Sequence, residues 1–138
     1  MTSNEALALL PDVNGCVVIL SGGMDSTIAM RLAVQKYGKE NVSALTFYYG
    51  QKQKREIEMA RMSTQILGVK HRVVDASFLG DISKGFSANV DTDMAMPTIK
   101  DVLGDPRPKT YVPNRNMILM SIAAAFAETQ NVDTVVCG

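Results

Sequence analysis

Short apolar runs alternate along the chain with longer segments of mixed polarity, and this alternation is its main structural signal. The apolar runs are uninterrupted and rich in β-branched residues, which is typical of strands buried on both faces of a parallel sheet. We expect such strands at residues 15–20, 42–48, 69–75 and 131–136. We expect helices at residues 25–37, 54–67 and 117–126, the last of them apolar nearly all round and therefore fully buried.

Regular alternation of strands and helices indicates a three-layer, Rossmann-like α/β domain with a parallel sheet. We assign residues 15–138 to this domain and treat residues 1–14 as an N-terminal lead-in. Residues 76–113 show no clear period and are rich in Gly, Pro, Asp and Ser. We predict a long mobile loop there, lying over a binding site; a dispensable surface excursion is the alternative.

A glycine-hinged turn between the first strand and the first helix carries the strongest chemical signal. Residues 20–27 read Leu-Ser-Gly-Gly-Met-Asp-Ser-Thr. The glycines allow unusual backbone angles, and the start of a helix leaves N–H groups unpaired, so the turn suits an anion such as a phosphate chain. The string is not a Walker A loop, because no Gly-Lys-Ser/Thr follows the glycines. It also lacks the third glycine of the dinucleotide fingerprint.

Further polar segments are expected at the same edge of the sheet. One follows the second strand and contains Tyr49, Gly50 and Gln51; another directly precedes the last helix and contains Asn114, Arg115 and Asn116. In open parallel sheets, ligands bind outside the carboxyl ends of the strands. An arginine at a helix start opposes the helix dipole, which favours an anion nearby. We therefore predict one shared pocket, with a surface salt bridge as the alternative role of Arg115.

Composition narrows the class of protein. The chain has 138 residues, 46% of them hydrophobic and 20% charged, which is enough for one domain with its own core. Its net charge is zero, so we expect no direct nucleic-acid partner and no membrane association. The N-terminus lacks the basic region of a secretory signal, and we expect a cytoplasmic protein.

The cysteines and the histidine are weaker signals. Cys16 and Cys137 are expected to be small buried thiols, with a disulfide or a metal pair as the alternative. His71 is the single histidine, and we expect a surface or hydrogen-bonded residue there rather than a base.

The string Ser-Gly-Gly-x-Asp-Ser resembles the pyrophosphate-binding loop, or PP-loop, of the ATP pyrophosphatase superfamily, which has the adenine nucleotide alpha hydrolase-like fold. Two further strings, Tyr-Tyr-Gly-Gln at 48–51 and Thr-Tyr-Val-Pro-Asn-Arg-Asn at 110–116, make residues 16–138 similar to the 7-cyano-7-deazaguanine synthase family. The resemblance implies that ATP is held by the loop residues Leu20, Ser21, Gly22, Gly23, Met24, Asp25, Ser26 and Thr27.

The same resemblance implies a ligase forming carbon–nitrogen bonds in queuosine biosynthesis. ATP and ammonia would convert 7-carboxy-7-deazaguanine to 7-cyano-7-deazaguanine through adenylated intermediates. Asp25 and Arg115 are implied as catalytic residues, and Asp25 as the ligand of Mg²⁺. The substrate or nucleotide pocket is implied to contain Tyr49, Gly50, Gln51, Asn114, Arg115 and Asn116.

The chain departs from the family pattern at two places. Lys52 and Gln53 stand where the family commonly has Arg-His, which removes a general base from position 53. The family's four-cysteine zinc site has no counterpart, so we expect a C-terminally truncated member whose zinc ligands lie beyond residue 138.

Other readings of the sequence stay open. The chain is alternatively another PP-loop enzyme, such as a tRNA thiolase or an amidotransferase synthetase domain, or an inactive nucleotide-binding fragment. A thiolase would need a reactive cysteine near the loop, whereas both cysteines lie in strand-like apolar runs. A homodimer and a monomer are both compatible with the sequence.

Overall fold

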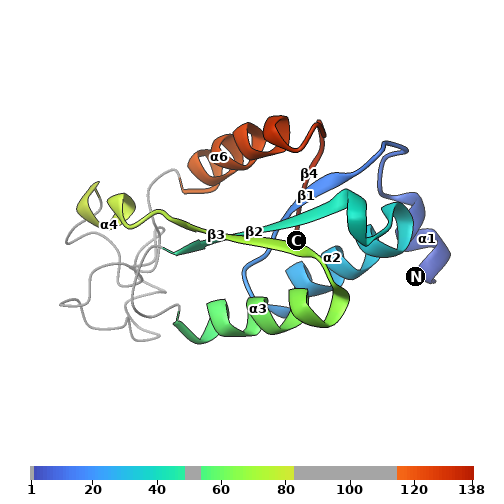
Figure 1. The fold of residues 1–138 in the computed structure, drawn as a ribbon, viewed down its shortest axis with the longest axis horizontal. Helices are drawn as coiled ribbons and strands as arrows, with labels where there is room; N and C mark the ends of the chain where they lie inside the picture. Colours follow the sequence, from blue (N-terminus) through green and yellow to red (C-terminus); the bar gives the residue numbers. More distant parts are fainter. Residues whose placement is uncertain (1, 49–53, 83–114) are drawn as a thin grey trace, which may run out of the picture.

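The computed structural model describes residues 2–48, 54–82 and 115–138. They form a parallel sheet of four strands in the order β3-β2-β1-β4 (Figure 1). The strands are β1 (Cys16–Ile19), β2 (Val42–Tyr48), β3 (Lys70–Asp75) and β4 (Val135–Cys137). The predicted α/β fold with a parallel sheet is confirmed.

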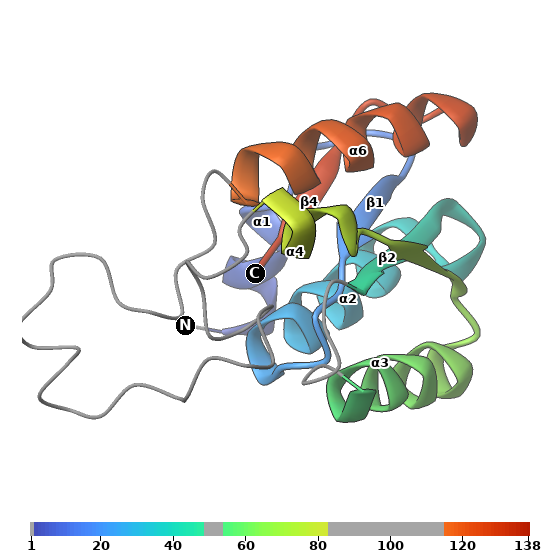
Figure 2. The same cartoon turned by 90° about the vertical axis from the view of Figure 1, so that its left-hand side faces the viewer.

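Helices cover both faces of the sheet. α2 (Met24–Tyr37) and α3 (Lys54–Leu67) lie on one face, and α6 (Arg115–Thr129) lies on the other, as Figures 1 and 2 show. Shorter elements complete the fold: α1 (Ser3–Ala8), the 3-10 turn η1 (Lys39–Asn41) and α4 (Phe78–Ile82). The structure is therefore three-layered, as expected.

A separate apolar cluster fills the space on each face of the sheet. Val17 and Val18 are both fully buried and point to opposite faces, because successive side chains alternate along a strand. Val18 joins the cluster beneath α2, and Val17 joins the cluster beneath α6. This two-sided burial explains why the strand at Cys16–Ile19 is continuously apolar in the sequence.

Glycines end the helices that precede β2 and β3. Gly38 follows α2 with a φ of 88°, and Gly68 follows α3 with a φ of 69°. Residues with a Cβ atom rarely adopt such angles, so glycine is the natural stop.

The described part of the lead-in, residues 2–14, packs on α2. Thr2 and Glu5 form a capping box at the start of α1. The Lys36 ammonium donates hydrogen bonds to the carbonyl oxygens of Leu7, at 3.1 Å, and Leu10, at 2.6 Å. None of the helices among the described residues has the length and apolarity needed to cross a membrane.

The structure corrects several sequence-based expectations. Residues 78–82 form α4 inside the segment expected to be a structureless loop; residues 83–113 of that segment lie outside the described part of the chain. The last strand begins at Val135 instead of residue 131, because Asn131 has a φ of 58° and still belongs to the turn that ends α6. Cys137 is exposed, not buried.

α6 is not buried all round. Leu119, Ala123 and Ala127 face the sheet, while the side chains of Met117 and Met120 are 67% and 38% exposed. The residue types on the two sides of this helix are similar, so the side that contacts the sheet could not be recognised from the pattern of polarity.

Candidate functional site

The two glycines of the 20–27 turn occupy different environments. Gly22 has a φ of 89°, and a Cβ atom built on it would lie 2.2 Å from the carbonyl oxygen of Glu56 in α3. Gly22 is therefore required by its backbone angle and by the close approach of α3. Gly23 has an ordinary φ of −80°, and a Cβ atom there would lie 3.5 Å from the Ser21 hydroxyl. The protein alone does not require glycine at position 23.

Hydroxyl groups fix the shape of the turn. The backbone N–H of Ser21 donates to the Ser26 hydroxyl oxygen at 3.1 Å, and the two hydroxyl groups lie 3.0 Å apart. The carbonyl oxygen of Gly23 accepts from the hydroxyls of Ser26, at 3.2 Å, and Thr27, at 2.7 Å. Three of the hydroxyls expected to bind phosphate thus also hold the loop in shape.

The first turn of α2 has no side-chain cap, and Gly138 lies against its Asp25–Ser26 peptide, where a Cβ atom built on Gly138 would be 2.9 Å from the Ser26 nitrogen. Gly23 is the N-cap residue of α2 and supplies no side-chain hydrogen bond to the helix start. The first N–H groups of a helix have no partner within the helix, and the dipole makes this end electropositive. Asp25 lies in this turn and is exposed.

A cavity of about 350 Å³ lies beside the turn, at the carboxyl ends of β1, β2 and β4. It brings together four predicted site residues, namely Leu20, Ser21, Ser26 and Asn116. The remaining lining residues were not predicted as site residues: Ile19, Phe47, Leu119, Met120, Cys137 and Gly138. Their only signal in the sequence is their position at strand ends or at the start of the last helix.

Five of the predicted pocket residues lie wholly or partly outside the described part of the chain. Tyr49, Gly50, Gln51 and Asn114 lie outside the described residues. Arg115 is the first residue of α6, and its side chain lies outside the described part of the structure. Asn116 itself is exposed and borders the cavity.

Asp25 can supply one of the oxygen ligands that Mg²⁺ needs, and the remaining ligands would come from phosphates and water. Mg²⁺ is commonly bound through one or two carboxylates together with the phosphates of the substrate. An exposed carboxylate in the first turn of α2 fits that pattern. Within the described ranges no cluster of three or more His, Cys, Asp or Glu side chains is arranged to hold a metal ion. The residues of this chain do not fit a four-cysteine zinc site, since the chain has only two cysteines.

The cysteines differ sharply in their surroundings. Burial in β1 raises the pKa of the Cys16 thiol to about 11, so this thiol stays protonated at neutral pH. Cys137 is exposed and borders the cavity, close to the turn in space although it lies in a strand. The sequence-based expectation that neither cysteine lies near the loop is therefore wrong for Cys137.

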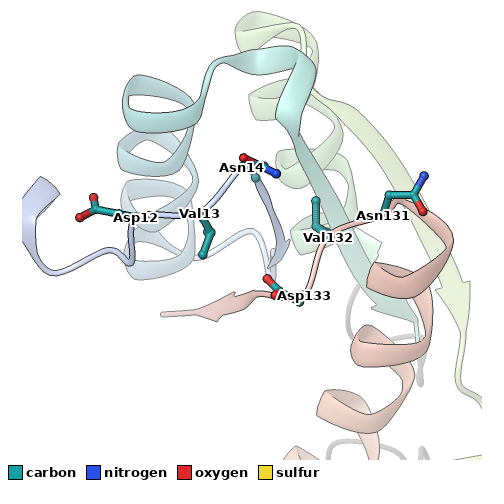
Figure 3. Close-up of a pocket in the computed structure, with 7 residues that line it drawn as sticks. Asp12, Val13, Asn14, Asn131, Val132 and Asp133 are labelled. Carbon is teal, nitrogen blue, oxygen red and sulfur yellow. The ribbon is translucent and has the colours of Figure 1, made fainter.

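Another cavity, of about 440 Å³, lies at the amino end of the sheet (Figure 3). It is formed by the segments that precede β1 and β4, at residues 12–15 and 131–133. Its charged lining groups are the carboxylates of Asp12 and Asp133, which disfavour an anionic ligand. The cavity at the carboxyl end, beside the helix start that lacks a side-chain cap, is the better site for phosphate.

Comparison with known families identifies the group of proteins to which this one is related. The family model for the queuosine biosynthesis protein QueC matches residues 15–138. The chain belongs to this family. The match contains the glycine turn and the start of α6.

Curated relatives of this chain are named 7-cyano-7-deazaguanine synthase. Those of Bacteroides fragilis and Phocaeicola vulgatus are 40% and 38% identical, over 91% and 88% of this chain. The relative from Koribacter versatilis is 39% identical over 92% of the chain. These matches cover 54%, 52% and 54% of the relatives, so the chain spans about half their length.

Solved structures with the same fold include NAD synthetases. The glutamine-dependent NAD+ synthetase of Acinetobacter baumannii, solved with ADP, superposes with a TM-score of 0.62 at 19% identity, over 88% of this chain and 21% of that one. The NH3-dependent NAD synthetase of Campylobacter jejuni gives 0.58 at 23% identity, over 94% and 49% of the two chains. At these identities the likeness supports the fold.

Proposed function

We propose that this chain is the ATP-binding part of a 7-cyano-7-deazaguanine synthase. It would hold ATP at residues 20–27 and use it to activate the carboxylate of 7-carboxy-7-deazaguanine for attack by ammonia. The observation that carries the proposal is the glycine turn, which joins a buried strand to an uncapped helix start beside a cavity. The names of the curated relatives supply the product, 7-cyano-7-deazaguanine, and the resemblance to their family supplies the carboxylate substrate.

Gly23 supports a ligand in this place. Its ordinary φ and the open space around it give no reason within the protein for glycine. A phosphate lying directly against the main chain would give that reason, because it would occupy the space of a Cβ atom.

The proposed chemistry needs positioning and charge stabilisation more than a side-chain nucleophile. A carboxylate is a poor electrophile, and transfer of the adenylyl group to its oxygen provides a good leaving group. Backbone N–H groups of the first turn of α2, with the hydroxyl of Ser21, would stabilise the charge that develops on departing pyrophosphate. Bound Mg²⁺, held by Asp25 together with the phosphates, would add to this stabilisation.

The remaining steps are assigned to the same edge of the sheet. Ammonia would displace AMP to give an amide, and a second activation by ATP would allow dehydration of the amide to the nitrile. Arg115 at the start of α6 would neutralise the substrate carboxylate or a phosphate. Tyr49, Gly50, Gln51, Asn114 and Asn116 would line the nucleotide or substrate pocket. Zinc has no ligand set in this chain, and no step is assigned to it.

The reaction products test the proposal. The 138-residue chain and the full-length Bacteroides fragilis relative are each incubated with ATP, Mg²⁺, ammonium and 7-carboxy-7-deazaguanine. AMP and pyrophosphate that form only with the carboxylate substrate support the proposal. ADP without AMP overturns it. ATP binding without turnover, alongside an active relative, assigns this chain to nucleotide binding alone.

Variants of the helix start separate a catalytic role from a structural one. We expect Asp25→Asn to abolish AMP formation while the midpoint of thermal unfolding stays unchanged, because Asp25 is exposed. Arg31→Ala, at an exposed position further along α2, is the matched control and should keep activity. A large loss of thermal stability in Asp25→Asn would contradict the catalytic role.

A further inference from the structure

A chain of hydrogen bonds runs from β3 through β2 to the peptide that begins the nucleotide loop. The Thr46 hydroxyl of β2 donates to the carbonyl oxygen of Leu20 at 2.7 Å. The same hydroxyl lies 2.8 Å from Nε2 of His71 on β3. Thr46 is 2% exposed, so this contact is shielded from water.

The Leu20–Ser21 peptide is therefore held at both of its polar groups. Its carbonyl oxygen accepts from Thr46, and its N–H, which belongs to Ser21, donates to the Ser26 hydroxyl at 3.1 Å. The Leu20 N–H in turn donates to the carbonyl oxygen of Leu45 at 2.9 Å. These bonds fix the plane of the peptide from which the glycine turn starts.

The number of protons available in this contact makes His71 the hydrogen-bond donor to Thr46. A threonine hydroxyl has one proton, and at 2.7 Å from a carbonyl oxygen that proton is donated to Leu20. The hydroxyl oxygen can then only accept from His71, so Nε2 carries a proton. If Nε2 were unprotonated, two acceptors would compete for one proton, and one buried group would stay without a partner.

The environment keeps His71 neutral at physiological pH. Burial lowers its pKa below the usual value, and the Arg61 side chain of α3 lowers it further. The imidazole lies on the α3 side of the sheet and is half-buried. No step of the proposed chemistry uses His71, so its place in this hydrogen-bond chain needs another explanation.

We propose that His71 and Thr46 are positioning residues for the nucleotide loop. They orient the Leu20–Ser21 peptide so that the donors of residues 21–27 point at the β- and γ-phosphates. The inference rests on the proposed binding of ATP at this loop. It adds Thr46 of β2, 26 positions along the chain from Leu20, and His71 of β3 to the determinants of phosphate binding.

A misoriented loop should weaken the binding of the β- and γ-phosphates more than the binding of the adenosine part of the ligand. Loss of one hydrogen bond that holds the peptide plane should weaken binding of ATP and of inorganic pyrophosphate by about two- to tenfold. AMP lacks the β- and γ-phosphates, so its affinity should change little. A residue needed only for folding would lower all of these affinities together.

Paired variants test the geometry of the donor. Gln places an amide N–H at the position of Nε2, whereas Asn is one bond shorter, so we expect His71→Gln to keep the affinity for pyrophosphate and His71→Asn to lose it. Thr46→Ser keeps the hydroxyl and should resemble the unaltered chain, while Thr46→Val removes it at nearly constant shape. Calorimetric titration with pyrophosphate, ATP and AMP gives the affinities, and thermal unfolding is followed in parallel.

The outcomes separate this inference from the function on which it rests. If the unaltered chain binds neither ATP nor pyrophosphate, the proposed function fails. If it binds both, and His71→Asn and Thr46→Val bind them equally well, the positioning role is overturned. An equal loss of affinity for AMP and pyrophosphate, or a lower unfolding temperature without any selective loss, assigns a structural role and also overturns it.

Discussion

The two glycines of the turn are glycine for different reasons, and the sequence alone does not distinguish these reasons. Gly22 is forced by its φ of 89° and by the Glu56 carbonyl oxygen of α3, whereas nothing in the protein forces Gly23. The two glycines could be recognised together from the sequence, because the string they form is characteristic of a phosphate loop. Which of them serves the fold depends on where α3 begins, and that contact is not local in sequence.

Alanine substitutions should therefore separate stability from binding. We expect Gly22→Ala to lower the free energy of unfolding by about 2 kcal/mol or more, because a strained φ and an overlap with α3 add together. Gly23→Ala should change it by no more than about 1 kcal/mol, since its backbone angles suit alanine.

Urea unfolding measures the first effect, and titration with pyrophosphate measures the second. Gly23→Ala should fold normally and bind pyrophosphate weakly, because its methyl group would occupy the place of the phosphate. Full affinity in this variant would show that no ligand approaches the main chain at Gly23.

His71 makes the stability of the fold depend on pH. Burial and Arg61 lower its pKa in the folded chain below the usual 6.5, so the unfolded chain binds more protons as pH falls. The stabilisation is present above pH 6.5 and is lost as pH falls through the lower, folded-state pKa. Urea midpoints at pH 7.5 and 5.5 should differ more for the unaltered chain than for His71→Gln.

Asp75 provides an internal check on this pH effect. Hydrogen bonds from Ser77 lower the pKa of its carboxyl below 3.8, so the stability that Asp75 contributes is lost only in more acid solution. The loss between pH 7.5 and 5.5 should therefore be unchanged in Asp75→Asn. If Asp75→Asn instead removes the loss of stability between pH 7.5 and 5.5, the assignment of that loss to His71 is contradicted.

At the scale of elements, long segments were predictable and short ones were not. α2 and α3 end where the sequence indicated, at glycines that their backbone angles require. α4 escaped prediction because a helix of five residues is too short to show a period. β4 was expected too early, since the apolar Val132 belongs to the turn that ends α6 and packs in the core there.

A substitution in α4 tests whether this short helix belongs to the core. Leu79 is 1% exposed and packs in the cluster beneath α6, so Leu79→Ala should lower the free energy of unfolding by about 2–4 kcal/mol. Ile82, in the same helix, is 70% exposed, and Ile82→Ala should change it by about 0.5 kcal/mol or less. Equal urea midpoints for the two variants would show that α4 is not packed as described.

For the molecule as a whole, the class of fold followed from the sequence and the order of its strands did not. Uninterrupted apolar runs predict buried parallel strands, and polar strand ends predict a binding edge. Cys137 reaches the same cavity as Ser21 because β4 lies next to β1, and Asn116 reaches it because α6 packs on β1. Both contacts are properties of tertiary packing. The resemblance to a family supplied the substrate, which no pattern of polarity contains.

The contrast between the two thiols offers a labelling strategy that needs no mutagenesis. A maleimide dye should react at Cys137, which is exposed beside the cavity, and spare Cys16, which is buried with a raised pKa. Fluorescence from that single dye would then report on the occupancy of the cavity in the native sequence. Nucleotide binding by this half-length relative of the synthases would become measurable in real time, without waiting for turnover.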